Sequence, residues 1–157
     1  MSRYCPCKDG QALYLDCQEC DNDCEKFYCL IVGTRTFTDY DLFKQVVNHM
    51  LSKIDKKDIV IISGGARGTD SLAKQYANEN GYKYYEFKAD WEQYGKSAGY
   101  RRNVDMQAYI SHFNRRAIIA FWDGESKGTK QNFDIAKKYD NKIVTIKYKE
   151  LKGYKGN

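Results

Sequence analysis

Long hydrophobic runs are missing from this sequence, and histidine occurs only twice in 157 residues. No apolar stretch approaches the roughly 20 residues that a membrane-spanning helix needs, which argues against membrane insertion. The N-terminus also lacks the apolar core of a secretory signal, so we expect a cytoplasmic location. Neither His49 nor His112 stands in a Ser-His-Asp or Cys-His arrangement, so the sequence predicts no triad-type hydrolase.

What is present describes one globular domain with a small addition. Apolar residues make up 42% of the chain and charged residues 30%, a balance typical of a water-exposed fold with one core. The net charge of +5 is uneven, because residues 1–28 carry −3 and the remainder carries +8. A basic body indicates an anionic partner such as a nucleotide or nucleic acid, although the lysine-rich segment 137–155 also fits a solvated surface.

Five of the six cysteines lie in the first 24 residues, spaced C-x-C-x9-C-x2-C-x3-C. Two close thiol pairs separated by a short loop can surround one zinc ion, and a segment with so few apolar residues needs metal binding to fold. We therefore expect a structural zinc-binding knob; free or redox-active thiols are the alternative. The expected ligands are Cys5, Cys7, Cys17 and Cys20, with Cys24 able to replace one of them.

From residue 27 onward, short apolar runs alternate with segments of helical period. The runs predict strands at 28–32, 59–63, 83–88, 117–122 and 142–148. Helices are expected from about residue 40 to 54, from 69 to 77, from 100 to 113 and from 130 to 139, the first capped by Thr38 or Asp39. Cys29 falls in the first run and is expected to be a buried thiol.

Near-continuous apolar strands favour a parallel sheet covered on both faces. The predicted fold class is α/β, a Rossmann-like, doubly wound and mainly parallel five-stranded sheet with helices on both faces. The expected organisation is a cysteine-rich zinc-binding extension at 1–26, the Rossmann-like domain at 27–150 and a basic tail at 151–157.

Ligands of such sheets bind at the carboxyl ends of the strands, so the residues after each strand are the candidates. Glycines there let the backbone approach a ligand, the helix beginning near Thr69 favours a phosphate, and arginines, including Arg102, can form bidentate contacts to anionic oxygens. The expected ligand-binding residues are Gly33, Thr34, Arg35, Ser63, Gly64, Gly65, Arg67, Gly68, Thr69, Asp70, Arg101, Asn103, Asp123, Gly128 and Thr129.

Asp70 and Asp90 are the candidate catalytic residues, as acid or base, and they can also accept hydrogen bonds from ribose hydroxyls. Trp91, Tyr94 or Tyr100 can stack on a base. A simpler interpretation stays open, in which the glycine pair is a tight turn and Asp70 stabilises the start of a helix with no ligand at all.

Three segments in order, GTRTFTD at 33–39, SGGARGTDSLAKQYA at 63–77 and AGYRRNVDM at 98–106, resemble the YspA-like, YpsA-related branch of the SLOG superfamily, over residues 28 to about 148. That superfamily is named after the Smf/DprA DNA-processing proteins and the Lonely Guy enzymes. The resemblance implies a Rossmann-like fold and a pocket for a nucleotide derivative, formed by the matching positions within the ligand-binding set above.

The resemblance leaves the activity open. Lonely Guy enzymes cleave N-glycosidic bonds with an arginine and the glutamate of a Gly-Gly-x-Gly-Thr-x-x-Glu motif, whereas here Leu72 stands three residues past Thr69. We expect binding of a phosphorylated nucleoside or nucleotide derivative, to sense or sequester it in phage defence or anti-defence, by a homo-oligomer. The alternatives are a hydrolase that cleaves an N-glycosidic or phosphate bond, and single-stranded nucleic-acid binding.

Overall fold

A computed structural model describes residues 26–151 and 154. The elements in chain order are β1 (Phe27–Gly33), α2 (Tyr40–Met50), η4 (Lys56–Asp58), β2 (Ile59–Ser63), α3 (Thr69–Asn80), β3 (Lys83–Glu86), α4 (Trp91–Tyr94), η5 (Gly95–Ser97), α5 (Ala98–Ser111), β4 (Arg116–Trp122), α6 (Lys127–Lys138), β5 (Ile143–Lys147) and η6 (Tyr148–Glu150). The predicted zinc ligands Cys5, Cys7, Cys17, Cys20 and Cys24 lie outside the described residues, so the zinc site stays a prediction.

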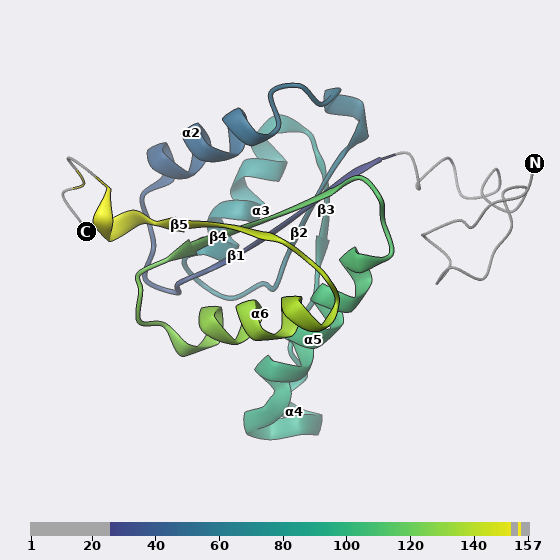
Figure 1. Ribbon diagram of the computed structural model, residues 1–157, viewed down its shortest axis with the longest axis vertical. Coiled ribbons are helices and arrows are strands. Elements are labelled where there is room, and N and C mark those ends of the chain that lie inside the picture. Colours follow the sequence, from purple (N-terminus) through teal and green to yellow (C-terminus); the bar gives the residue numbers. More distant parts are fainter. Residues whose placement is uncertain (1–25, 152–153, 155–157) are drawn as a thin grey trace, which may run out of the picture.

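The strands form one sheet in the order β3-β2-β1-β4-β5, and every neighbouring pair is parallel. This confirms the Rossmann-like α/β class and sharpens it, since the expected mainly parallel sheet is parallel throughout. Figure 1 shows α2 and α3 on one face of the sheet and α5 and α6 on the other. The sheet is therefore doubly wound: β2 and β3 are added on one side of β1, and β4 and β5 on the other, so the strand order reverses between β1 and β4.

The strands β1 and β2 lie inside the molecule because almost all of their residues are buried. All five residues of β2 are buried, as are the five inner residues of β1. Alternate side chains of β1 enter two separate clusters, because successive residues of a strand point to opposite faces. Cys29 and Ile31 face α2 and α3, whereas Leu30 and Val32 face α5. Cys29 is fully buried, which confirms the buried thiol expected there, and burial raises the pKa of its thiol to about 12.

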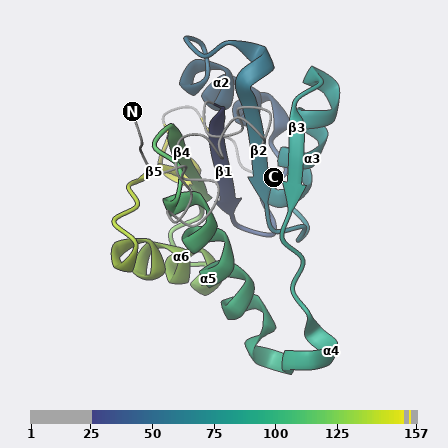
Figure 2. The same ribbon diagram turned by 90° about the vertical axis from the view of Figure 1, so that its right-hand side faces the viewer.

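Short polar residues fix where the helices begin. The Asp39 side chain accepts a hydrogen bond from the amide of Leu42 at 3.1 Å and caps α2, as one of the two predicted caps. Ser126 caps α6 by accepting from the Thr129 amide, so this helix begins at Lys127, three residues earlier than predicted. The segment after β3 contains the short helix α4, where a loop was expected, and Figure 2 shows it projecting beyond the sheet. Among the described residues, no helix has the length and apolar character needed to cross a membrane.

Candidate ligand-binding site

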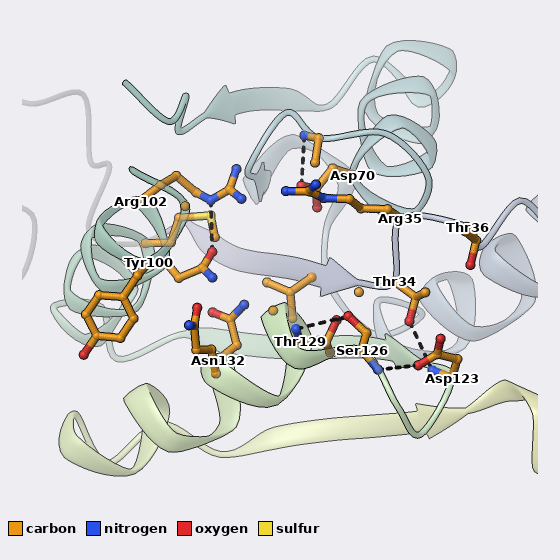
Figure 3. Close-up of a pocket in the computed structure, with 18 of the residues that line it drawn as sticks. Thr34, Arg35, Thr36, Asp70, Tyr100, Arg102, Asp123, Ser126, Thr129 and Asn132 are labelled. Carbon is orange, nitrogen blue, oxygen red and sulfur yellow. Dashed lines mark hydrogen bonds between the residues drawn. The ribbon is translucent and has the colours of Figure 1, made fainter. Parts of the chain in front are cut away.

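A cavity of about 480 Å³ opens at the carboxyl ends of β1 and β4, where the direction of the strand order reverses. This is the position at which open parallel sheets bind ligands. Figure 3 shows side chains from the β1–α2 loop, α3, α5 and α6 gathered around it. The lining residues are Val32, Gly33, Thr34, Arg35, Thr36, Ala66, Asp70, Lys96, Gly99, Tyr100, Arg102, Asn103, Met106, Asp123, Ser126, Gly128, Thr129, Gln131 and Asn132.

One wall joins the loop after β1 to the loop after β4. The Asp123 amide donates to Thr34 Oγ1 at 3.1 Å, and Asp123 Oδ1 accepts from the Ser126 amide at 2.8 Å (Figure 3). Asp123 Oδ1 also accepts from the Glu125 amide, at 2.8 Å. Partial burial works to raise the pKa of Asp123, but these amide hydrogen bonds outweigh it and hold the pKa below its usual value. Asp123 therefore shapes the turn that places the amino end of α6, with Gly128 and Thr129, at the cavity.

The glycine loop after β2 is braced by the loop after β1. Gly68 has a φ of +72° and lies against the backbone of Arg35, where no side chain fits. Thr69 donates to the Thr34 carbonyl from its amide at 3.2 Å and from its hydroxyl at 2.9 Å. Ser63 is fully buried and hydrogen-bonds the Tyr84 hydroxyl at 2.6 Å. Of the predicted ligand-binding residues, Ser63, Gly68 and Thr69 thus support the loops and do not line the cavity.

Asp70 is the acidic group of the glycine loop. Its carboxylate accepts from the Ala66 amide at 3.1 Å, and the side chain is only 8% exposed. Burial raises its pKa above 3.8, while the Ala66 amide and the charges of Arg102 and Arg35 act in the opposite direction. In the glycine loop, where the sequence analysis expected a phosphate, the protein's own carboxylate therefore accepts a hydrogen bond from the main chain.

Two neighbouring arginines on α5 point to different places. Arg102 is half-buried, donates to the Gly64 carbonyl and to Asn103 Oδ1 (2.9 Å), and lines the cavity. Arg101 is exposed, lies over the Tyr94 ring at 4.2 Å from its centroid and donates to Ser97 Oγ at 3.2 Å. The structure thus does not bring the predicted Arg101 to the cavity.

A second cavity of about 710 Å³ adjoins the first across Arg102. It holds the predicted residues Gly64, Gly65 and Arg67, together with Glu86. Arg35, Ala66 and Arg102 line both cavities, so they form the partition between them. The predicted Asp90 lines neither cavity; it is exposed and caps α4 by accepting from the Gln93 amide at 3.1 Å.

Comparisons with known proteins find matches to the part of the chain that forms this site. The model of the YspA, cpYpsA-related SLOG family matches residues 29–94. These residues include most of β1, all of β2 and β3, and the loops that follow β1 and β2. Gene 61 protein of Mycobacterium phage D29 is 31% identical over 122 residues, covering 74% of this chain and 94% of the phage protein.

The chain belongs to the YspA, cpYpsA-related SLOG family. This confirms the resemblance drawn from the three sequence segments. DNA processing protein A (DprA) from Streptococcus pneumoniae, of known X-ray structure, is similar with a TM-score of 0.56 at 15% identity. The match covers 85% of this chain but 54% of the DprA chain, so the SLOG chain spans about half the length of that protein. At this identity the likeness shows a shared fold.

The sequence analysis missed several residues of this SLOG-family site. Asn132 and Ser126 could have been predicted from Thr129, because residues three positions apart lie on the same side of a helix and Thr129 was already expected at the site. Glu86 carried a signal of its own, since it is the acidic residue that ends β3. Lys96 and Thr36 gave no signal that separates them from other surface residues, whereas Tyr100, one of the three aromatic residues considered for base stacking, does line the cavity. Among the described residues, no three His, Cys, Asp or Glu side chains gather as a metal site.

The raised pKa of Asp70 predicts how the stability of the protein depends on pH. A carboxyl whose pKa is higher in the folded state than the unfolded value of 3.8 binds more protons when folded, so its contribution to stability falls as pH rises. Asp70→Asn cannot ionise, and we expect its free energy of unfolding, relative to wild type, to increase as the pH is raised from 3.5 to 7.5. Urea unfolding of both proteins across this range measures the difference; a difference that decreases with pH contradicts the prediction.

Proposed function

We propose that this protein binds a phosphorylated nucleoside or nucleotide derivative, to sense or to sequester it, in the cavity at the carboxyl edge of the sheet. The observation that carries this proposal is the composition of one wall. The amino end of a 12-residue helix, α6, and the cations of Arg35 and Arg102 line the same cavity. A volume of about 480 Å³ lies within the range of small-molecule sites.

The phosphate fits best at the amino end of α6. The first amides of a helix have no partner within the helix, and the helix dipole favours negative charge at that end. A Cβ at Gly128 would meet no atom within 4 Å, so the space beside this first turn is open, while the Thr129 amide is capped by Ser126 Oγ. At the start of α3, the Thr69 amide already donates to the Thr34 carbonyl, and the Asp70 carboxylate holds the Ala66 amide of the preceding loop. The structure therefore favours a different helix from the one that the sequence analysis chose.

The nucleoside fits the part of the cavity beneath α5. Val32 and Met106 supply apolar surface there, and Tyr100, which is 41% exposed, stands at the rim. An aromatic side chain at the mouth of a cavity can stack on a base that enters it. Asp123 lines the same cavity, and its carboxylate can accept a hydrogen bond from a ribose hydroxyl.

Titration calorimetry with AMP, IMP, ADP-ribose, NAD and cyclic AMP tests the binding proposal. We expect at least one of these nucleotides to bind with a dissociation constant below about 100 μM, as for an ordinary specific small-molecule site. Failure of all five to bind at millimolar concentration overturns the proposal. Steeply salt-dependent binding to an oligonucleotide in place of the nucleotides would support the nucleic-acid alternative instead.

Hydrolysis of the bound nucleotide is a second candidate function, which the burial of Asp70 favours. A carboxyl with a raised pKa beside an arginine, at the wall of a cavity, is suited to proton transfer. Chromatography of the titration mixtures would show the products. Asp90→Asn is the matched control for Asp70→Asn, because Asp90 is an exposed helix cap outside both cavities. Product formation by wild type and the Asp90 variant, with none by the Asp70 variant, would support hydrolysis; no products from wild type would leave binding alone.

A further inference from the structure

Three buried amide side chains form a chain of hydrogen bonds behind the cavity. Asn141, just after α6, donates from Nδ2 both to the main-chain carbonyl of Gln107 and to Gln107 Oε1, each at 3.0 Å. Gln107, on α5, donates from Nε2 to Asn132 Oδ1 on α6 at 3.1 Å. Gln107 is fully buried, and Asn132 is 4% exposed and lines the cavity. We call Asn141, Gln107 and Asn132 the amide relay.

The polarity of the amide relay is set at its inner end. A main-chain carbonyl can only accept, so Asn141 must turn its NH₂ group toward Gln107. The Gln107 side chain must then present its oxygen to that NH₂ group, and its own NH₂ group faces Asn132. The oxygen of Asn132 therefore already accepts one hydrogen bond, from Gln107. What Asn132 has left for the cavity is its Nδ2, a donor that has no partner among the described residues.

This arrangement carries a cost, which indicates that the orientation matters. Asn141 Oδ1 is buried with no hydrogen-bond partner in the described part of the chain. An unsatisfied buried oxygen destabilises the fold, and native proteins contain few of them. Turning Asn141 over would satisfy nothing, because its oxygen would then face the carbonyl oxygen of Gln107.

Asn103 repeats the pattern on the other side of the cavity. It is 5% exposed, and its Oδ1 accepts from Arg102 Nε at 2.9 Å. Its Nδ2 is also without a partner among the described residues, and Asn103 lines the same cavity as Asn132. Each asparagine therefore has a free donor at the cavity, while its oxygen already accepts one hydrogen bond from the protein.

We propose that Asn103 and Asn132 form a base subsite whose free amide donors select 6-oxopurines, hypoxanthine or guanine, over adenine. An asparagine with both amide atoms free pairs with the N6 donor and N7 acceptor of adenine, whereas O6 and N7 of a 6-oxopurine are both acceptors. This inference rests on the proposed nucleotide binding and names the class of base. Asn132 contacts the base, and Gln107 and Asn141 are positioning residues.

The decisive experiment titrates the full chain with IMP and AMP, because hypoxanthine and adenine differ in the carbonyl or amino group at C6. We expect IMP to bind at least about tenfold more tightly, the discrimination typical of one well-placed base contact. Equal binding, or tighter binding of AMP, overturns the subsite and leaves nucleotide binding standing. Binding of neither IMP nor AMP overturns the subsite, and failure of the remaining nucleotides as well would overturn nucleotide binding itself.

Two variants test how the preference arises. Asn132→Asp keeps an acceptor for Gln107 Nε2 but presents an oxygen to the cavity, so the IMP preference should fall to about one or invert. Gln107 does not itself line the cavity, and Gln107→Met removes the hydrogen bond that holds Asn132 Oδ1, so the preference should also decline.

Gln131→Glu is the control, because Gln131 is the neighbouring exposed residue of the cavity wall and gains the same charge. It should weaken both nucleotides alike and preserve their ratio. Circular dichroism and thermal unfolding confirm that each variant is folded. An unchanged ratio in a folded Asn132→Asp or Gln107→Met protein overturns the proposal, and if one of them does not fold the other decides.

Discussion

Replacement of Arg102 by methionine is expected to weaken nucleotide binding about 100-fold, or about 2.7 kcal/mol, with little change in the shape of the side-chain stem. Arg102 is a cation of the cavity wall, and its Nε holds the oxygen of Asn103 while its Nη1 holds the Gly64 carbonyl. Methionine loses the charge toward the ligand and both bonds within the wall. Calorimetric titration with the tightest-binding nucleotide measures the loss.

Arg101→Met is the matched control, since the two arginines are adjacent on the same helix and the substitution is identical. Arg101 is exposed and packs on Tyr94, away from the cavity. Its removal should change the affinity by no more than about twofold, as expected for a surface substitution. A larger effect for Arg101 than for Arg102 would show that the ligand lies on the outer face of α5 and would contradict the site described above.

Gly68→Ala is expected to cost about 4 kcal/mol of the free energy of unfolding. The backbone at Gly68 has φ of +72° and ψ of −125°, a combination that residues with a side chain avoid. An added Cβ would also overlap the carbonyl of Arg35 and lie 2.7 Å from its Cα. Because the obstacle is backbone, relief requires the loops after β1 and β2 to separate. Urea-induced unfolding followed by circular dichroism measures the change.

Gly81→Ala is the reference for a positive φ without a backbone obstacle, at a ψ of 22° where Gly68 has −125°. Gly81 ends α3 with the same φ of +72°, but a Cβ there would meet nothing within 4 Å. We expect a loss of about 1–2 kcal/mol, the cost of a left-handed conformation alone. Equal losses at both positions would mean that the Arg35 backbone yields to the new methyl group, and the close packing of the two loops would then contribute nothing measurable.

Much of the fold could be predicted because hydrophobic period and loop chemistry agree along the chain. The run Ile59–Ser63 was predicted with its observed bounds, since a fully buried strand has no polar interruption and ends at the glycine pair. The amino end of α6 was placed too late because Ser126, a cap residue, precedes a first turn with no apolar residue. The short helix α4 was missed because four residues are too few to show a period.

The site was harder to predict than the sheet, for reasons of direction. Adjacent residues of a helix point about 100° apart, so Arg101 and Arg102 cannot be distinguished until the buried face of α5 is known. Sequence reasoning chose Arg101, while the cavity holds Arg102. The glycine loop was recognised, but its anion is the Asp70 carboxylate from the following helix turn. The amide relay joins residues 107, 132 and 141, a contact that no local pattern reveals.

The position of Arg102 between the two cavities also sets a limit on ligand length. A mononucleotide can occupy the first cavity while the guanidinium keeps its bonds to Gly64 and Asn103. Under the proposed binding, a longer molecule that reaches Glu86 and Lys88 in the second cavity passes Arg35, Ala66 and Arg102, and its atoms can replace the two hydrogen bonds of Arg102. Only a ligand with acceptors at that point along its length can do so at low cost. The partition therefore limits ligand length: it favours either a short ligand or a long one with a bridging anion, such as a pyrophosphate, at its middle.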